Sequence, residues 1–301
     1  MWFKNLQVYR LPASWDADIS RLDAQLAGRA LQGCGAMDMQ SAGWLSPRGD
    51  ERFLYISNRQ CLLACGAEQK LLPAAVVNQV ARERAAEISG REGRPVGRRE
   101  LRELKERVTD ELLPRAFVRR RVTWVWIDPV HGWLVVDAAA RAKAEEVLGL
   151  LLKSVDELPA RLLKTRLSPG AAMTAWLSEG EAPAGFTLDR DLELRAPGDE
   201  RATVRYVRHA LEGGEIRTHI AEGKSATRLG MTWNDRISFV LTEDLQIKRL
   251  AFLDILKEES EGQAESDEER FDIDFALMSG ELAKLLAALV EALGGEMPES
   301  P

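Results

Sequence analysis

Cysteine, histidine and long apolar runs are all scarce in this chain of 301 residues. It has three cysteines and three histidines. So few cysteines, and an odd number of them, argue against a disulfide framework and favour a reducing compartment such as the cytoplasm. No stretch reaches the roughly 18–20 consecutive apolar residues that cross a bilayer. The first eleven residues lack the apolar segment and cleavage site of a secretory signal. We therefore expect a cytoplasmic protein without a membrane partner.

The scarcity of histidine and cysteine also limits metal and acid–base chemistry. Two cysteines share strand parity, but a zinc site needs two further ligands, and the histidines are far from them in sequence. Three histidines leave little general-base chemistry. We expect buried structural thiols, no metal, no cofactor and a protein that is not an enzyme. The residues concerned are Cys34, Cys61, Cys65, His131, His209 and His219.

The composition is otherwise that of a globular protein, with 45% hydrophobic and 30% charged residues. The net charge of −7 counts, at first, against nucleic acid as a partner. The charge is uneven, however. Residues 82–121 contain thirteen basic and eight acidic side chains, whereas residues 254–301 contain three basic and fourteen acidic ones. The acidic balance therefore belongs to the C-terminal part.

Short strands paired through tight turns alternate with amphipathic helices along the chain, which predicts an α+β fold with antiparallel sheets. Two helices joined by a Gly/Pro loop, with Pro114 ending the second, predict a projecting helical hairpin. The expected helices are 16–26, 74–89, 98–113, 139–154, 214–222 and 278–293, and the expected strands are 3–11, 52–57, 60–65, 122–128, 132–137, 203–209, 227–233, 236–242 and 247–252.

The same pattern divides the chain into three regions. Residues 1–75, 122–160 and 278–301 form a central α+β region, and residues 76–121 form a basic helical finger. Residues 161–277 form a second α+β region that contains an acidic loop at 258–269.

Arginine stands almost alone at the finger loop and at the finger exit. Its planar, permanently charged fork suits phosphate oxygens, so these residues would clamp a nucleic-acid backbone. The alternative is a solvated helical pair with i,i+4 ion pairs such as Glu103–Arg107. Phe117 would either insert at a base step or plug the base of its own hairpin. The arginines are Arg91, Arg94, Arg98, Arg99, Arg115, Arg119, Arg120 and Arg121.

Two further motifs are weaker. Glu222–Ser225 resembles the end of a P-loop, but Thr218 stands where the leading glycine is required, so Lys224 is expected only as an exposed cation for phosphate. In Phe271–Phe275, alternation would place Asp272 and Asp274 on one strand face. That pair would suit a magnesium-dependent nuclease or simply an edge strand. A protein-interaction module acting through the acidic tail is a third alternative.

Several stretches, spread from the first residues to the last, resemble the bacterial recombination-associated RdgC family. They are Trp2–Leu11, Leu112–Phe117, Trp126–Asp128, His219–Lys224, Arg270–Phe275 and Met278–Ala283 with Gly294–Glu296. The resemblance implies a curved subunit that closes into a ring-shaped homodimer through two different contacts, one at the fingers and one at the opposite end. Single- or double-stranded DNA would pass through the basic hole without sequence specificity. The resemblance further implies a nucleoid-associated protein that restrains recombination promoted by RecA.

The resemblance also implies DNA-binding residues. Arg94 matches a basic finger residue, Arg115 and Phe117 match a Pro-Arg-Ala-Phe motif, and Lys224 matches the lysine of a Gly-Lys pair. A basic-polar pair on a neighbouring strand matches Arg208 and His209, although a neutral amide is expected in place of the histidine. Arg119 and Arg120 exceed the family pattern and would strengthen the clamp. The full predicted set is Arg94, Arg98, Arg115, Phe117, Arg119, Arg120, Arg208, His209 and Lys224.

Overall fold

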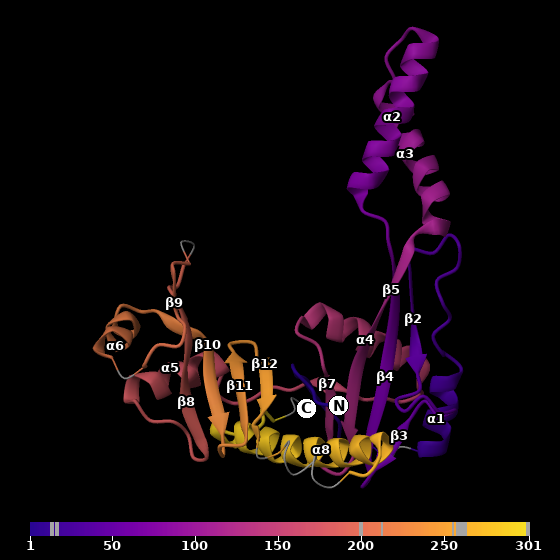
Figure 1. Ribbon diagram of the computed structural model, residues 1–301. Helices are drawn as coiled ribbons and strands as arrows, with labels where there is room; N and C mark the ends of the chain where they lie inside the picture. The colour runs from indigo at the N-terminus through magenta and orange to yellow at the C-terminus, as the bar shows by residue number, and fades with distance from the viewer. Residues whose placement is uncertain are drawn as a thin grey trace.

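Two antiparallel sheets stand side by side above one long helix, and a helical finger rises from one of them (Figure 1). This computed structural model describes residues 1–12, 15, 18–198, 201–211, 213–254, 256 and 264–298. The finger and the far sheet form the two arms of a U-shaped outline, and the N-terminus lies between them. The predicted α+β class with antiparallel sheets and a projecting helical hairpin is confirmed.

The first sheet has the strand order β2-β4-β5-β6-β1-β7, with β3 paired to β4. One of its faces packs against α1 (Ile19–Ala27) and α4 (Arg141–Ser154), and Trp44 is fully buried there. The strands are β1 (Gln7–Arg10), β2 (Gln40–Leu45), β3 (Tyr55–Ser57), β4 (Gln60–Leu71), β5 (Phe117–Asp128), β6 (Trp133–Val136) and β7 (Arg161–Leu162).

The second sheet has the order β12-β11-β10-β8-β9 and packs against α5 (Pro169–Glu179) and α8 (Asp267–Ala292). Its apolar core is continuous with the other face of the first sheet, where Trp126 is fully buried. One core therefore joins the two arms. The strands are β8 (Phe186–Arg195), β9 (Thr203–Tyr206), β10 (Ser225–Trp233), β11 (Ile237–Thr242) and β12 (Ile247–Phe252), and α6 (Gly214–Ala221) connects β9 to β10.

The finger is an antiparallel pair of helices, α2 (Ala74–Glu92) and α3 (Arg98–Leu112), that continues strands β4 and β5. Gly93 ends α2 at φ +67°, a left-handed conformation that glycine adopts without strain. Ala81, Leu104 and Val108 form a small core of its own. A 3₁₀ turn, η1 (Leu113–Arg115), follows α3 at the predicted stop.

Residues 271–275 were predicted as a strand, and this prediction is wrong. They lie inside α8, which begins at Asp267 instead of 278. Phe271 and Phe275 are four residues apart, so they share a helical face as well as a strand face and both contact Tyr55. The expected acidic loop ends sooner, because residues 267–269 form the first turn of α8, where acidic side chains favour the helix dipole. Residues 258–263 of that loop lie outside the described residues.

Other elements differ mainly in length. The tight turn expected between strands 52–57 and 60–65 is confirmed at Asn58 and Arg59, with φ of 50° and 63°. Strand β5 begins at Phe117 instead of 122, because it pairs with the whole length of β4. Strand β9 ends at Tyr206, three residues before the predicted end. Strands β2, β7 and β8 and helix α5 were not predicted from the sequence.

The prediction of buried thiols is confirmed for two of the three cysteines. Cys61 and Cys65 are buried, and burial raises their pKa to about 12 and about 11. Cys34 is only half-buried, and its thiol contacts the carbonyl oxygen of Glu68. All three are free thiols.

Candidate nucleic-acid interface

The base of the finger is a ribbon in which β5 pairs with β4, and β2 pairs with the other edge of β4 as far as Gln69. All of the first six residues of β5 are exposed, whereas five of its last six are buried. Phe117 pairs with Leu71, and Arg119 pairs with Gln69. Because side chains alternate along a strand, Phe117, Arg119 and Arg121 share one face of this ribbon.

Phe117 does not plug its hairpin. Its side chain is 84% exposed, which is the highest value for a large hydrophobic residue in the described part of the chain. The interpretation of Phe117 as a plug is therefore wrong for the single chain. An exposed aromatic ring beside arginines is the arrangement on which a nucleic-acid base stacks.

Three arginines at the finger base are available to a ligand. Arg115, in η1, and Arg119 and Arg121, in β5, are all exposed. None of them forms an ion pair with any residue that the structure describes. Arg119 donates one hydrogen bond, to the amide oxygen of Gln69 at 3.0 Å. Their guanidinium charges are thus uncompensated within the described chain.

Arg120 differs from these neighbours, because its side chain lies on the opposite face of the ribbon. It donates two hydrogen bonds to one oxygen of Glu68, at 2.9 and 2.6 Å. Glu68 also accepts from the backbone N–H of Cys34, and this bond and the Arg120 contact lower the pKa of the carboxyl. Arg120 is thereby engaged within the fold, and its contribution to DNA binding stays a prediction.

The finger tip contains both arginines that form ion pairs within the helical pair and an arginine that is available for phosphate. Arg94 lies 2.7 Å from Glu92 and 2.9 Å from Glu100, and Glu103 pairs with Arg99 instead of Arg107. These contacts fit the solvated helical pair. Arg98, the first residue of α3, is exposed and has no ion pair with a described residue, so it remains available for phosphate.

The remaining predicted residues lie on the opposite arm, around β9 and α6 (Figure 1). Arg208 is exposed in a turn at φ +53°, and its backbone N–H donates to Asp191. The ring of His209 contacts Tyr206 and lies 3.6 Å from Glu215. The structure therefore divides the predicted site into two groups on separate arms.

Lys224 was expected to be an exposed cation, and this expectation is wrong. Its side chain is only 15% exposed. The ammonium lies 2.7 Å from the carboxylate of Glu222 and 3.0 Å from Nδ1 of His219. A phosphate would have to compete with Glu222 for this charge.

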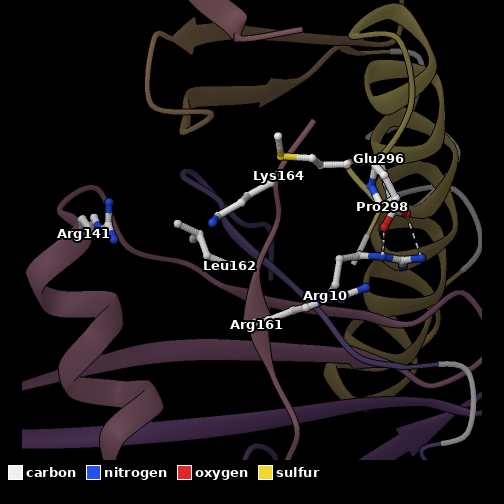
Figure 2. A pocket seen from close by; sticks show the side chains of 8 residues that line it. Arg10, Arg141, Arg161, Leu162, Lys164, Glu296 and Pro298 are labelled. Atoms are coloured by element: carbon white, nitrogen blue, oxygen red, sulfur yellow. Dashed lines mark hydrogen bonds and ion pairs between the residues drawn. The ribbon is translucent and has the colours of Figure 1, made fainter. Parts of the chain in front are cut away.

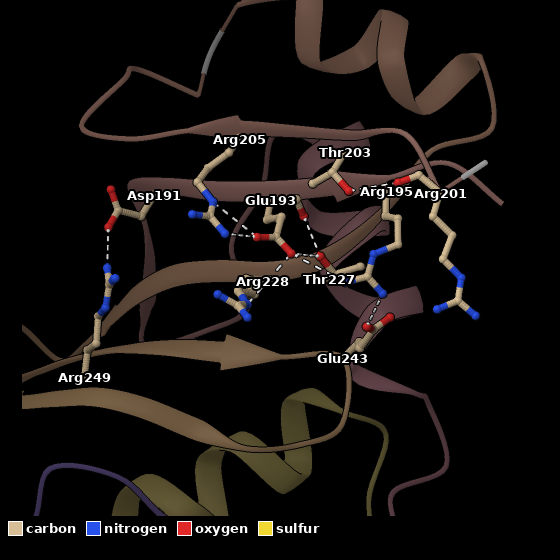
Figure 3. Close-up of polar contacts among 10 residues, drawn as sticks. All are labelled: Asp191, Glu193, Arg195, Arg201, Thr203, Arg205, Thr227, Arg228, Glu243 and Arg249. Carbon is tan, nitrogen blue, oxygen red and sulfur yellow. Dashed lines mark hydrogen bonds and ion pairs between the residues drawn. The ribbon is translucent and has the colours of Figure 1, made fainter. Parts of the chain in front are cut away.

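An array of arginines on the second sheet was missed from the sequence (Figure 3). Buried Glu193 on β8 lies 2.5 Å from Arg205, 3.5 Å from Arg195 and 3.8 Å from Arg228. Burial acts to raise the pKa of Glu193, but hydrogen bonds from Arg205 and Thr227 and the nearby positive charges outweigh it and lower the pKa. One carboxylate thus holds three guanidinium groups at the surface.

This array adjoins the predicted residue Arg208. Asp191, two residues before Glu193, accepts from the Arg208 backbone and lies 3.5 Å from Arg249. A shallow pocket of about 130 Å³ opens beside these groups. The alternation of charged residues in β8 would have revealed the array, but it went unread because β8 itself was not predicted.

The carboxylates proposed for a nuclease do not form a pair. Residues two apart on a helix point in different directions. Asp272 accepts from the hydroxyl of Tyr55 at 2.6 Å and lies 3.3 Å from Arg48, whereas Asp274 contacts the amino group of Met1. Burial, followed by the Asp272 contact, raises the pKa of Tyr55 to about 12.

Neither a metal site nor a membrane span is found in the part of the chain that the structure describes. No group of three or more His, Cys, Asp or Glu side chains is placed to hold a metal ion there. Within the same residues, every helix is too short or too polar to cross a bilayer.

Comparison with known proteins gives matches over almost the whole chain. Residues 1–296 match a family model described as "Putative exonuclease, RdgC". A protein of Janthinobacterium sp. (strain Marseille) is 57% identical over 297 residues, which cover 99% of both chains. Similar proteins of Herminiimonas arsenicoxydans (57% identical) and Bordetella pertussis (55% identical) each match 98% of this chain and 99% of their own length. All three are called "Recombination-associated protein RdgC".

Proposed function

This chain belongs to the RdgC family of recombination-associated proteins, and on that premise we propose that it binds DNA without sequence specificity and is not an enzyme. The observation that carries the proposal is the finger base. There, Arg115, Arg119 and Arg121 have no carboxylate partner among the described residues, although the chain as a whole is acidic. Phosphate contacts of this kind supply affinity without reading sequence.

We further propose that two copies close a ring around DNA. By occupying DNA in this way, the protein restrains RecA-promoted recombination in the nucleoid. The U-shaped outline supports the proposal, because each arm carries a basic cluster: the finger arginines on one, and Arg208 with the Glu193 array on the other (Figures 1 and 3). A second copy that joined both arms would enclose the space between them. Single- and double-stranded DNA both present the required phosphates.

A gel-shift series that compares linear with closed circular DNA of equal length tests this function. The chain should bind both forms at low salt, because counterion release drives the association. As the salt concentration rises, a closed ring should remain on circles and slide off linear ends. Equal loss from both forms would exclude a ring and leave an open clamp, and absence of binding at low salt would exclude DNA binding itself.

Replacing Phe117 by alanine separates contact with DNA from support of the fold. The ring is 84% exposed, so we expect the free energy of unfolding to change by less than about 0.5 kcal/mol. A stacked base contributes about 1–3 kcal/mol, so affinity for single-stranded DNA should fall roughly tenfold. Thermal melting and fluorescence anisotropy measure the two quantities. Lost stability with unchanged affinity would contradict the stacking role.

A further inference from the structure

A basic pocket lies at the base of the U, outside both predicted groups of DNA-binding residues. It has a volume of about 760 Å³ and lies beside strand β7, the start of α4 and the C-terminal segment (Figure 2). Strand β7 is the edge strand of the first sheet, and Figure 1 places it on the side of that sheet that faces the second sheet. Its charged lining residues are Arg10, Arg141, Arg161, Lys164 and Glu296. We call it the basal pocket.

Arg10 and Glu296 neutralise each other and build one wall. Two nitrogens of Arg10 lie 3.0 and 2.8 Å from the two carboxylate oxygens of Glu296. The same guanidinium donates to the carbonyl of Gly132 and covers the ring of Trp133 at 4.1 Å. This pair is therefore part of the fold, and the only carboxylate that lines the pocket within the described residues is already compensated.

Three further cations line the pocket, and they come from different segments. Lys164 is exposed, and its ammonium makes no hydrogen bond or ion pair with any described residue. Arg161 is exposed on β7. Arg141 begins α4 and lies 2.8 Å from Glu145, but both side chains are more than half exposed. Such a surface pair is worth little, so it would exchange readily for a phosphate.

We propose that the basal pocket binds phosphodiester groups of the DNA backbone, as a third contact between the two arms. This inference rests on the proposed function. The pocket favours the backbone over bases, because no aromatic residue lines it and Arg10 covers the nearby Trp133 ring. Its position favours a polymer over a free nucleotide, because β7, which lines the pocket, lies between the finger arm and the arm that carries β9, so that one strand can contact both arms and the pocket.

The test compares two double variants that remove the same charge. Arg161→Ala with Lys164→Ala removes two pocket cations, and Arg21→Ala with Lys153→Ala removes two exposed cations on α1 and at the far end of α4. Each lost phosphate contact lowers the slope of log affinity against log salt by about 0.9. We expect the pocket variant to lower that slope by about 1.8 and to weaken binding roughly tenfold, with the control nearly unchanged.

Equal slopes in the two double variants would overturn the inference. Arg115→Ala is run alongside: if it weakens binding while the pocket variant does not, the inference fails and the proposed function stands. If the wild type binds no DNA, both fail. Lys164→Gln, which keeps most of the side-chain bulk, replaces the double variant if that variant melts early, with an expected slope change of about 0.9. Competition by millimolar ATP that exceeds competition by salt of equal ionic strength would show a free-nucleotide site instead.

Discussion

Replacing Arg115, Arg119 and Arg121 together by alanine is expected to weaken DNA binding by about 100-fold. The estimate assigns roughly 1 kcal/mol to each charge-assisted phosphate contact. The slope of log affinity against log salt should fall by about 2.7, because a complex that has lost three phosphate contacts releases fewer counterions when it forms. The fold should be unaffected, since all three side chains are exposed and none forms an ion pair with a described residue. Anisotropy titrations over a salt series measure both quantities.

Two controls make this prediction specific. The triple variant Arg21→Ala, Arg52→Ala and Lys153→Ala removes the same charge from exposed positions elsewhere. It should reduce affinity only through the net charge, with little change in slope. A similar slope in both triple variants would mean that overall charge, and not the finger base, determines binding.

Two predicted cations that already contact a carboxylate, Arg120 and Lys224, should contribute less to DNA affinity. Arg120 is hydrogen-bonded to Glu68, and Lys224 lies beside Glu222 with 15% of its side chain exposed. Both would have to exchange a carboxylate for a phosphate. The expected order of loss is therefore Arg115→Ala first, with smaller effects for Arg120→Ala and Lys224→Ala.

Asp274→Ala is expected to lower the free energy of unfolding by about 3 kcal/mol. Asp274 is 5% exposed on α8, and its carboxylate accepts from the amino group of Met1, which is also largely buried. Removing one partner of a buried ion pair leaves the other charge uncompensated, and such changes cost about 3–5 kcal/mol. Urea unfolding measures the loss. Glu268→Ala, on the same helix but 86% exposed, should change stability by less than about 0.5 kcal/mol.

The same residues test the alternative of a metal-dependent nuclease. If Asp272 and Asp274 are structural, purified protein should leave plasmid DNA intact in the presence of magnesium. Cutting that Asp272→Asn abolishes would instead support the enzyme. Asp272 accepts from Tyr55 and lies beside Arg48, so its replacement should disturb the contact between α8 and β3.

The sequence predicted local elements best where turn chemistry or helix stops are strong. Asn58 and Arg59 formed the expected turn, and Pro114 ended the finger. The prediction failed where the spacing of apolar residues fits both a strand and a helix. Phe271 and Phe275, four residues apart, share one face in either structure. Such segments are decided by what they pack against, here Tyr55.

The candidate site was predictable as a set of residue types and not as an arrangement. Phe117 and the arginines around it were identified from their position after Pro114. Their exposure follows from the ribbon that β4 and β5 extend beyond the core, which no local pattern encodes. The Glu193 array and the basal pocket bring together residues from three or more segments, so sequence proximity gave no signal for either.

The scarcity of cysteine and histidine, the uneven charge and the family were determined by the sequence alone, because each depends on residue identity. The tertiary structure decided which charges are available. Arg115 and Lys224 are equally cationic in sequence, yet Arg115 is exposed without a carboxylate partner in the described chain, whereas Lys224 lies beside Glu222 with only 15% of its side chain exposed. The difference is physical: desolvation and a carboxylate within 3 Å reduce what a cation offers to phosphate, and both depend on the folded neighbourhood.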